Sequence, residues 1–318
     1  MRDRTGWFAD CGWGVLCHWL APDPDLPAEI WNEWVDDFDV EGLADQLAGV
    51  GAPYLFITIG QNSGHYIAPN EAYDRHVGIR PSKCSRRDLV TDLHGALGAR
   101  GIELLVYLPG GAPAGDPVAC ERLGWEWGYE GEWPDAWGTP RTGRRLAEFQ
   151  SKWEQIVREW SRRWGRRVRG WWIDGCYFAD EMYRHQDPPN FASFAAALRS
   201  GNPDALVAFN PGVRTPVICH SRHEDYTAGE VARALPECPG PWVERDGYCA
   251  RYHVLSYLGE SWCKGSPRFP TELVVGYTRH ITQKGGVITW DAPIQRSGLM
   301  PDVYVEQLRA IGRRMGTV

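Results

Sequence analysis

The chain has 318 residues, 34 of them Lys or Arg and 41 Asp or Glu, so its formal net charge is −7. This length suits two domains of about 150 residues or one (β/α)8 barrel of about 250. A chain of this length can bury enough surface to be stable without disulfide bonds or a structural metal. With 43% apolar and 24% charged residues and no long basic run, the composition excludes a disordered chain and argues against nucleic acid as a partner. The 17 tryptophans are unusual, because indole faces that are not buried serve for stacking.

In chain order, short apolar runs alternate with amphipathic segments, which is typical of parallel α/β proteins. The predicted elements are strand Trp13–His18, helix Val40–Val50, strand Pro53–Ile59, helix Ser85–Leu97, strand Ile102–Leu108, helix Gly143–Trp164, strand Val168–Ile173, helix Asn190–Leu198, strand Ala205–Phe209, weaker strands Pro216–Cys219 and Tyr252–Tyr257, helix Thr271–Ile281, strand Gly286–Trp290 and helix Asp302–Met315. About eight strands, with no Gly-x-Gly-x-x-Gly after the first, favour a (β/α)8 TIM-like barrel over an open doubly wound sheet. We therefore expect one α/β domain over residues 1–318.

A Trp-rich insertion loop is predicted at about 109–144, between the third strand and the next helix. It is rich in Gly and Pro, and it contains Trp125, Trp127, Trp133 and Trp137. Loops longer than about 12–15 residues are usually functional or disordered, and the four indoles argue against disorder. We expect this loop to supply a wall of the functional pocket.

The start of the chain and its cysteines bear on the compartment. Asp10 and two glycines interrupt the apolar residues that a signal peptide would need, and no run approaches the roughly 20 apolar residues of a membrane span. The nine cysteines are scattered without a Cys-x-x-Cys pair. The sequence therefore predicts a cytoplasmic protein with reduced thiols and no membrane partner, and it leaves the oligomeric state open.

The carboxyl ends of the predicted strands carry the side chains that could do chemistry, because barrel enzymes place their sites there. These ends supply carboxylates, amides, imidazoles and indoles: His18, Trp19, Gln61, Asn62, His65, Tyr66, Trp172, Asp174, Glu260, Trp262 and Asp291. Indoles stack on the apolar faces of sugars, while amides and acids bind their hydroxyls. We therefore predict a saccharide site that uses neither a metal nor another cofactor.

Asp174 is the strongest catalytic candidate, since it follows three apolar residues and precedes Gly175. An Asp-Gly pair is also common in ordinary turns, where the aspartate has no catalytic role. A glycosidase would need a second carboxyl group, which in a retaining enzyme lies about 5–5.5 Å from the first.

Several motifs resemble those of the retaining α-L-fucosidase family. Trp7–Trp19, which ends in His18-Trp19, is similar to the family's opening motif, and Trp172-Ile173-Asp174-Gly175 resembles its nucleophile motif. Asp225–Glu230 resembles an Asp-aromatic-Thr-Glu stretch that carries the acid/base in some members. Weaker similarity occurs at Arg87–Val90, Arg100–Ile102, Ser261–Trp262, Gly285–Val287 and Leu308–Met315, so the resemblance spans nearly the whole chain.

This resemblance implies a glycoside hydrolase that acts with retention on an α-linked sugar, either fucose or a related one. It implies that Asp174 is the nucleophile and Glu230 the acid/base, with Glu224 and Glu260 as alternatives for that second role. His18 would bind a sugar hydroxyl and Trp262 would line the pocket, although His18 could instead be a core histidine.

The chain also departs from the family pattern. Gly60–His65 stands where the fucosidases carry Lys-His-His-Asp-Gly-Phe, so Gln61 and Asn62 replace the paired imidazoles that hold fucose hydroxyls. Leu20 follows His18-Trp19 where the family has Gly, and no C-terminal β-sandwich is expected. Amides can still donate and accept hydrogen bonds to hydroxyls, so a polar subsite is expected even if the preferred sugar differs.

Two other functions fit parts of the sequence. A non-catalytic carbohydrate-binding barrel would lack a carboxyl group within roughly 10 Å of Asp174. A metal-dependent hydrolase would use His220 and His223, three residues apart in one predicted loop.

Overall fold

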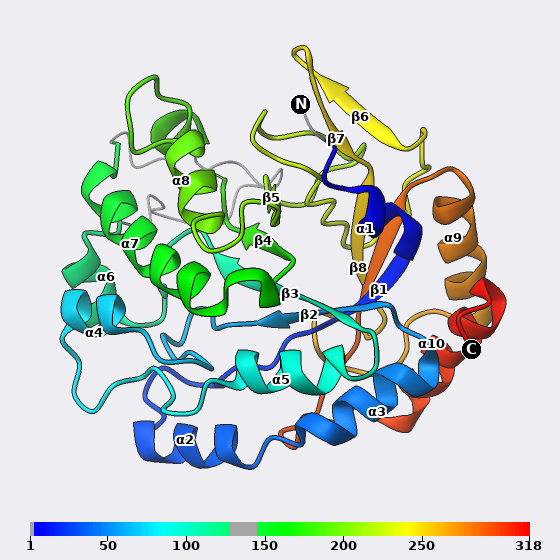
Figure 1. The fold of residues 1–318 in the computed structure, drawn as a ribbon, viewed down its shortest axis with the longest axis horizontal. Coiled ribbons are helices and arrows are strands. Elements are labelled where there is room, and N and C mark those ends of the chain that lie inside the picture. The colour runs from blue at the N-terminus through cyan, green and yellow to red at the C-terminus, as the bar shows by residue number, and fades with distance from the viewer. Residues whose placement is uncertain (1–2, 127–144, 178) are drawn as a thin grey trace.

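A computed structural model describes residues 3–126, 145–177 and 179–318. Its centre is a curved, seven-stranded parallel sheet with the strand order β5-β4-β3-β2-β1-β9-β8 (Figure 1). The strands are β1 (Trp13–Cys17), β2 (Tyr54–Thr58), β3 (Glu103–Pro109), β4 (Gly170–Asp174), β5 (Leu206–Phe209), β8 (His253–Tyr257) and β9 (Val287–Asp291). The predicted α/β barrel is confirmed.

Residues 225–231 lie between the two edge strands and take the eighth position of the barrel. On one side, the backbone N–H of Asp225 donates to the carbonyl of Val207 at 2.9 Å. On the other, the N–H of Leu255 donates to the carbonyl of Gly229 at 2.9 Å, and Glu230 forms a parallel bridge with Leu255. The ring of strands is therefore closed by an irregular segment.

The predicted strand Pro216–Cys219 is wrong, because these residues form no strand and the eighth position is filled further along the chain. Pro211 and Pro216 have no backbone N–H to give to a ladder, which disfavours a strand in this stretch. The other weak prediction, Tyr252–Tyr257, is confirmed as β8.

Apart from α1, the helices lie around the outer face of the sheet (Figure 1). Among the described residues they are α1 (Gly6–Cys11), α2 (Ala28–Asp36), α3 (Val40–Val50), α4 (Glu71–Val77), α5 (Leu89–Gly98), α6 (Pro117–Leu123), α7 (Ala147–Trp164), α8 (Phe191–Leu198), α9 (Thr271–Gln283) and α10 (Asp302–Met315), with short 3-10 and π turns at Gly165–Arg167 and Ala179–Tyr183. All six predicted helices are present among the described residues, and residues 143 and 144 of the predicted helix Gly143–Trp164 lie outside them. Strands β6 (Trp242–Arg245) and β7 (Tyr248–Arg251) form a separate antiparallel hairpin, which the sequence did not predict.

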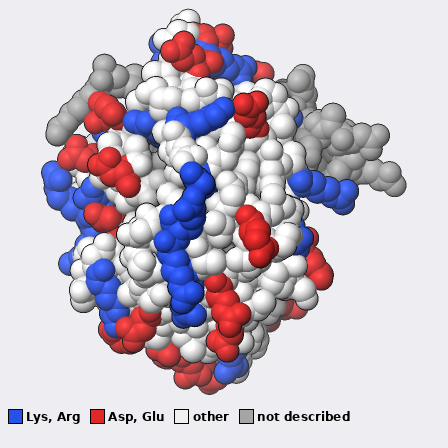
Figure 2. All heavy atoms as spheres, turned by 90° about the vertical axis from the view of Figure 1, so that its right-hand side faces the viewer, with Lys and Arg blue, Asp and Glu red and all other residues white. Residues whose placement is uncertain are grey.

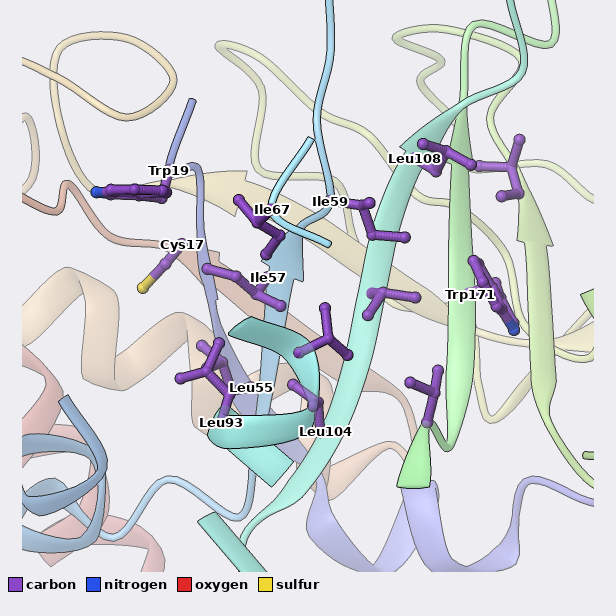
Figure 3. Close-up of a cluster of buried hydrophobic side chains, with 14 of the residues drawn as sticks. Cys17, Trp19, Leu55, Ile57, Ile59, Ile67, Leu93, Leu104, Leu108 and Trp171 are labelled. Carbon is purple, nitrogen blue, oxygen red and sulfur yellow. The ribbon is translucent and has the colours of Figure 1, made fainter. Parts of the chain in front are cut away.

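Side chains alternate between two apolar layers along each strand, as period-2 geometry requires. Leu55 and Leu104 point outward and pack with Leu93 of α5 in the layer between sheet and helices (Figure 3). Leu16 and Trp172 point inward and belong to the barrel interior. Two residues further along β1 and β4, the same inward face ends in His18 and Asp174, at the carboxyl-terminal mouth.

Helix α1 closes the opposite end of the barrel. The ring of Phe8 is fully buried, and its centroid lies 5.1 Å from those of both Tyr54 and Tyr226. Because β2 begins at Tyr54, this aromatic cluster fills the amino-terminal end. The interior is therefore accessible from the carboxyl-terminal mouth.

The insertion loop is more regular than predicted where the structure describes it, since residues 117–123 form α6. Trp125 is buried, and its ring lies 4.6 Å from that of Phe149 on α7. Trp127, Trp133 and Trp137 lie outside the described residues.

Charge is mixed on the face turned toward the viewer in Figure 2, which is the α9 and α10 side of the molecule. A row of Lys and Arg side chains runs down this face, with Asp and Glu side chains beside it. All nine cysteines are free thiols. Within the described part of the chain, no helix combines the length and apolar character that crossing a bilayer would demand.

Candidate active site

A pocket of about 210 Å³ opens at the carboxyl-terminal mouth of the barrel. It combines two carboxyl groups with aromatic, imidazole and amide side chains from strands on all sides of the barrel. Its lining residues are His18, Leu20, Gln61, Tyr107, Trp172, Asp174, Glu230, Leu255, Trp262 and Cys263. Six of the residues that the sequence singled out for a saccharide site are thus brought together.

Asp174 ends β4, and its carboxylate is held by several donors. Its Oδ1 accepts from the backbone N–H of Gly175 at 2.7 Å, from Nδ2 of Asn210 at 2.8 Å and from the Tyr177 hydroxyl at 3.3 Å. Its Oδ2 accepts from the Tyr107 hydroxyl. Gly175 has a φ of 71°, so the sharp turn expected of an Asp-Gly pair is present, and the aspartate nevertheless faces the pocket.

Glu230 lies on the closing segment and completes a pair of carboxyl groups with Asp174. Its Oε2 accepts from Nδ2 of Asn210 at 2.6 Å. Burial and, second, the charge of Asp174 raise the pKa of Glu230 to about 8, against a smaller lowering by Asn210. At neutral pH Glu230 is therefore mostly protonated and can act as an acid.

The two carboxyl groups lie close together because both are bonded to the same nitrogen of Asn210. Their oxygens can therefore be no farther apart than the sum of 2.8 and 2.6 Å. Asn210 follows β5 directly and is fully buried. It directly follows the predicted strand Ala205–Phe209, but the sequence did not select it as a site residue.

His18 and Asp291 form a second pair on the other side of the pocket. Nδ1 of His18 lies 2.8 Å from Oδ1 of Asp291, whose Oδ2 accepts from the backbone N–H of Cys263 at 2.7 Å. Asp291 is fully buried and does not line the pocket, so its predicted role as a direct sugar ligand is not supported by this placement. It instead orients His18, whose ring also meets that of Trp262 at 5.9 Å.

Aromatic side chains form the floor of the pocket. Trp172 stacks on Tyr107 with a centroid distance of 5.3 Å and an interplanar angle of 16°, and its Nε1 donates to the carbonyl of Ala228 at 2.9 Å. The Tyr107 hydroxyl accepts from Nε2 of Gln61 at 2.5 Å. Tyr107 was missed from the sequence, although it follows Leu105 on the inward face of β3 and that alternation could have identified it.

Trp19 and Asn62 line an adjoining groove of about 620 Å³, which shares His18, Leu20, Gln61 and Cys263 with the pocket. Gly115 is the only described residue of the insertion loop that lines this groove, and none of residues 110–126 lines the pocket. The described part of the insertion loop therefore contributes to the wall of the groove and not to the wall of the pocket.

Three predicted sugar ligands lie away from the pocket. His65 is buried, with Nε2 bonded to the Leu26 carbonyl at 2.9 Å, and Tyr66 is buried against Tyr73 and Trp160. The chain after β2 turns back toward the helix layer, which carries both side chains away from the mouth. Glu260 is exposed outside the pocket lining.

Glu224, an alternative acid/base, has both carboxyl oxygens bonded to the backbone. Oε1 accepts from the N–H of Phe209 at 2.9 Å, and Oε2 from those of His220 and Ser221 at 2.7 and 2.9 Å. Glu224 is buried and does not line the pocket. Glu224 therefore has a structural role in the barrel.

We expect Glu224→Ala to lower the free energy of unfolding by about 3 kcal/mol, because three buried N–H groups lose their acceptor. Glu260→Ala, the exposed counterpart, should change it by less than about 0.5 kcal/mol. Urea unfolding of both variants measures the difference. Equal stability of the two variants would contradict the structural role of Glu224.

Comparison with known proteins identifies solved structures with a similar fold. No family model matches the chain, and no curated protein matches it. Among solved structures it is similar to the endo-fucoidan hydrolase P5AFcnA from glycoside hydrolase family 107, with a TM-score of 0.73 and 18% identity over 99% of this chain and 94% of that one. The fold resembles that of fucosidase-type glycoside hydrolases.

Two further structures support the same likeness. The endo-fucoidan hydrolase MfFcnA4, also from family 107, has a TM-score of 0.72 and 19% identity over 97% of this chain, which spans 53% of that protein. The α-L-fucosidase AlfC from Lactobacillus casei, solved with its α-L-fucose product, has a TM-score of 0.65 and 15% identity over 98% of both chains. The fucosidase-like resemblance predicted from the sequence motifs is thus confirmed for the fold.

Proposed function

We propose that the chain is a retaining glycoside hydrolase that acts on α-linked fucose or a related sugar. The observation that carries this proposal is the pair of carboxyl groups, Asp174 and Glu230, bonded to one amide nitrogen at the barrel mouth. Retaining glycosidases place their two carboxyl groups about 5–5.5 Å apart, whereas inverting ones keep them about 6.5–9.5 Å apart to admit a water. The shared nitrogen supports the shorter spacing.

Asp174 and Glu230 have different surroundings, which supports different roles: Asp174 as the nucleophile, and Glu230 first as the acid and then as the base. In the first step, an oxygen of Asp174 attacks the anomeric carbon, and the electron pair of the breaking C–O bond goes to the leaving oxygen, which takes the proton of Glu230. In the second step, the Glu230 carboxylate takes a proton from water, the water oxygen attacks the anomeric carbon, and Asp174 is released.

The remaining pocket residues suit a sugar. Trp172 and Trp262 offer apolar faces for stacking, while His18 and Gln61 offer polar groups to hydroxyls. Two of the similar structures are an endo-fucoidan hydrolase and an α-L-fucosidase in complex with α-L-fucose, so fucose is the first sugar to test. The cytoplasmic location remains a prediction, which cell fractionation would check.

No observation favours the two alternatives. A binding barrel without catalysis would lack a carboxyl partner for Asp174, and Glu230 is present beside it. In the proposed metal site, His220 has Nε2 bonded to the carbonyl of Cys176 at 2.9 Å and Nδ1 near Arg184 at 3.3 Å. In the described part of the chain, no three His, Cys, Asp or Glu side chains converge as metal ligands.

Product stereochemistry tests the proposal. We expect the wild-type protein to hydrolyse 4-nitrophenyl α-L-fucoside or the α-linked glycoside of a related sugar, and not the β-anomers. Proton NMR during the first minutes should show the α-sugar forming first and then mutarotating. Initial release of the β-sugar would refute retention, and an inactive protein across the α-linked panel would refute the glycosidase.

A further inference from the structure

Asn210 is tied to both flanks of Asp174 through its backbone. Its N–H donates to the carbonyl of Ile173 at 2.7 Å, and its carbonyl accepts from the N–H of Cys176 at 3.0 Å. The residue is fully buried. The backbone of Asn210 is therefore fixed relative to the strand end that carries the proposed nucleophile.

The orientation of the Asn210 amide is also determined. Its Oδ1 accepts from the backbone N–H of Gly212 at 3.0 Å, so the NH₂ group must point the other way, into the site. A primary amide has two N–H donors, and here one reaches Asp174 and the other Glu230. Both donors are thus committed to the carboxyl pair.

This arrangement distinguishes the two oxygens of Glu230. Oε2 accepts a hydrogen bond from Asn210, so in the protonated acid the hydrogen belongs on Oε1. From the described residues, Oε1 receives no hydrogen bond, which leaves its O–H free to meet a leaving-group oxygen in the pocket.

We propose that Asn210 is a positioning residue that sets the spacing of Asp174 and Glu230 and directs the transferable proton to Oε1 of Glu230. The inference rests on the proposed function, and it adds a role for a residue that acts on the reaction through the two carboxyl groups that it holds.

Other groups also act on the pair. Tyr107 and Tyr177 donate to Asp174 from β3 and from the loop after β4, and His18 faces the pocket from β1 with Asp291 behind it. None of these groups is bonded to Glu230 in the described structure, so Asn210 is the link whose removal should alter both carboxyl groups together. A simultaneous change in Asp174 and Glu230 is therefore the result that distinguishes loss of Asn210 from loss of the other groups.

The test uses Asn210→Ala and the more conservative Asn210→Asp, which keeps the acceptor for Gly212. We expect kcat to fall about 10²-fold in both variants with little change in KM, because proton transfer is misdirected while sugar contacts remain. The alkaline limb of the pH profile should move upward in Asn210→Ala, since the Asn210 hydrogen bond lowers the pKa of Glu230.

Asn202 provides a matched control, because it is equally a buried asparagine next to β5 but lies at the other end of that strand. Its Oδ1 accepts from the N–H of Asp204 at 3.1 Å, and its Nδ2 donates to the carbonyl of Val168 at 3.0 Å. Asn202→Ala should lose stability while keeping the wild-type kcat per folded molecule and the same pH profile.

The kinetic results that would overturn the inference are wild-type kcat in both Asn210 variants, an unmoved alkaline limb in Asn210→Ala, or losses matched by Asn202→Ala. Infrared titration of the Glu230 carboxyl in the wild type and Asn210→Ala, each with its Glu230→Gln counterpart as reference, gives a readout that needs no turnover. An inactive wild type would refute the proposed function, whereas an unchanged infrared titration would refute the positioning role.

Discussion

Asp174→Asn should reduce kcat on an aryl α-glycoside by about 10⁴- to 10⁶-fold, the loss expected when the nucleophile of a covalent mechanism is removed. Asparagine keeps the size of the side chain at the end of β4, so the pocket should stay folded. The variant replaces the carboxylate by a neutral amide, whose oxygen is a far weaker nucleophile toward the anomeric carbon. Steady-state kinetics, with circular dichroism to verify folding, measures the effect.

The smaller variant Asp174→Gly extends this test. Azide ions can enter the vacated space and should restore turnover, giving a glycosyl azide of inverted configuration. Asp187→Asn is a matched control, because Asp187 lies in the loop after the same strand with its side chain 75% exposed. If Asp174→Asn retains wild-type turnover, the residue has no part in the mechanism.

Glu230→Gln should have an effect that depends on the leaving group. For a leaving group that needs a proton, kcat/KM should fall about 10²- to 10⁴-fold, because glutamine can accept from Asn210 but has no acidic proton to give. For 2,4-dinitrophenolate, which leaves without a proton, the first step should stay near its wild-type rate. A panel of aryl glycosides with graded leaving groups measures this split.

The pH profile gives a second signature of the same residue. The pKa of Glu230 is raised to about 8, so the acid is protonated below that pH and loses its proton above it. Wild-type activity should therefore fall as the pH rises through about 8, and this limb should disappear in Glu230→Gln. Glu244→Gln, on the exposed surface of β6, should keep the wild-type profile. A limb that persists in Glu230→Gln would assign the titration to another group.

Sequence patterns predicted most of the barrel because its regular elements carry local signals. Helix α3 has the predicted bounds, since its apolar residues follow a 3.6-residue period between the cap Asp39 and the left-handed Gly51. The closing segment 225–231 carries no such signal: it mixes polar residues with Gly229, and its position depends on contacts with β5 and β8. Short helices such as α6 were missed because seven residues span only about two turns.

The candidate site was partly predictable for a similar reason. Strand ends can be identified in the sequence, so Asp174, His18 and Trp172 were selected from their positions, and all three line the pocket. The direction of a loop beyond a strand depends on tertiary packing, and for this reason His65 and Tyr66 were placed at the mouth when they pack elsewhere.

Side chains accept some of the hydrogen bonds that hold β5 against the closing segment of the barrel. The backbone N–H groups of Val207 and Phe209 donate to side-chain carboxyl oxygens of Asp225 and Glu224, at 3.0 and 2.9 Å. An ordinary parallel ladder uses carbonyl oxygens as acceptors, which a substitution cannot remove. We therefore expect point mutations at Asp225 or Glu224 to weaken the contact between β5 and the closing segment that carries Glu230. The proposed acid thus lies on a part of the barrel whose position depends on side chains, whereas the proposed nucleophile ends a strand that is paired through its backbone on both sides.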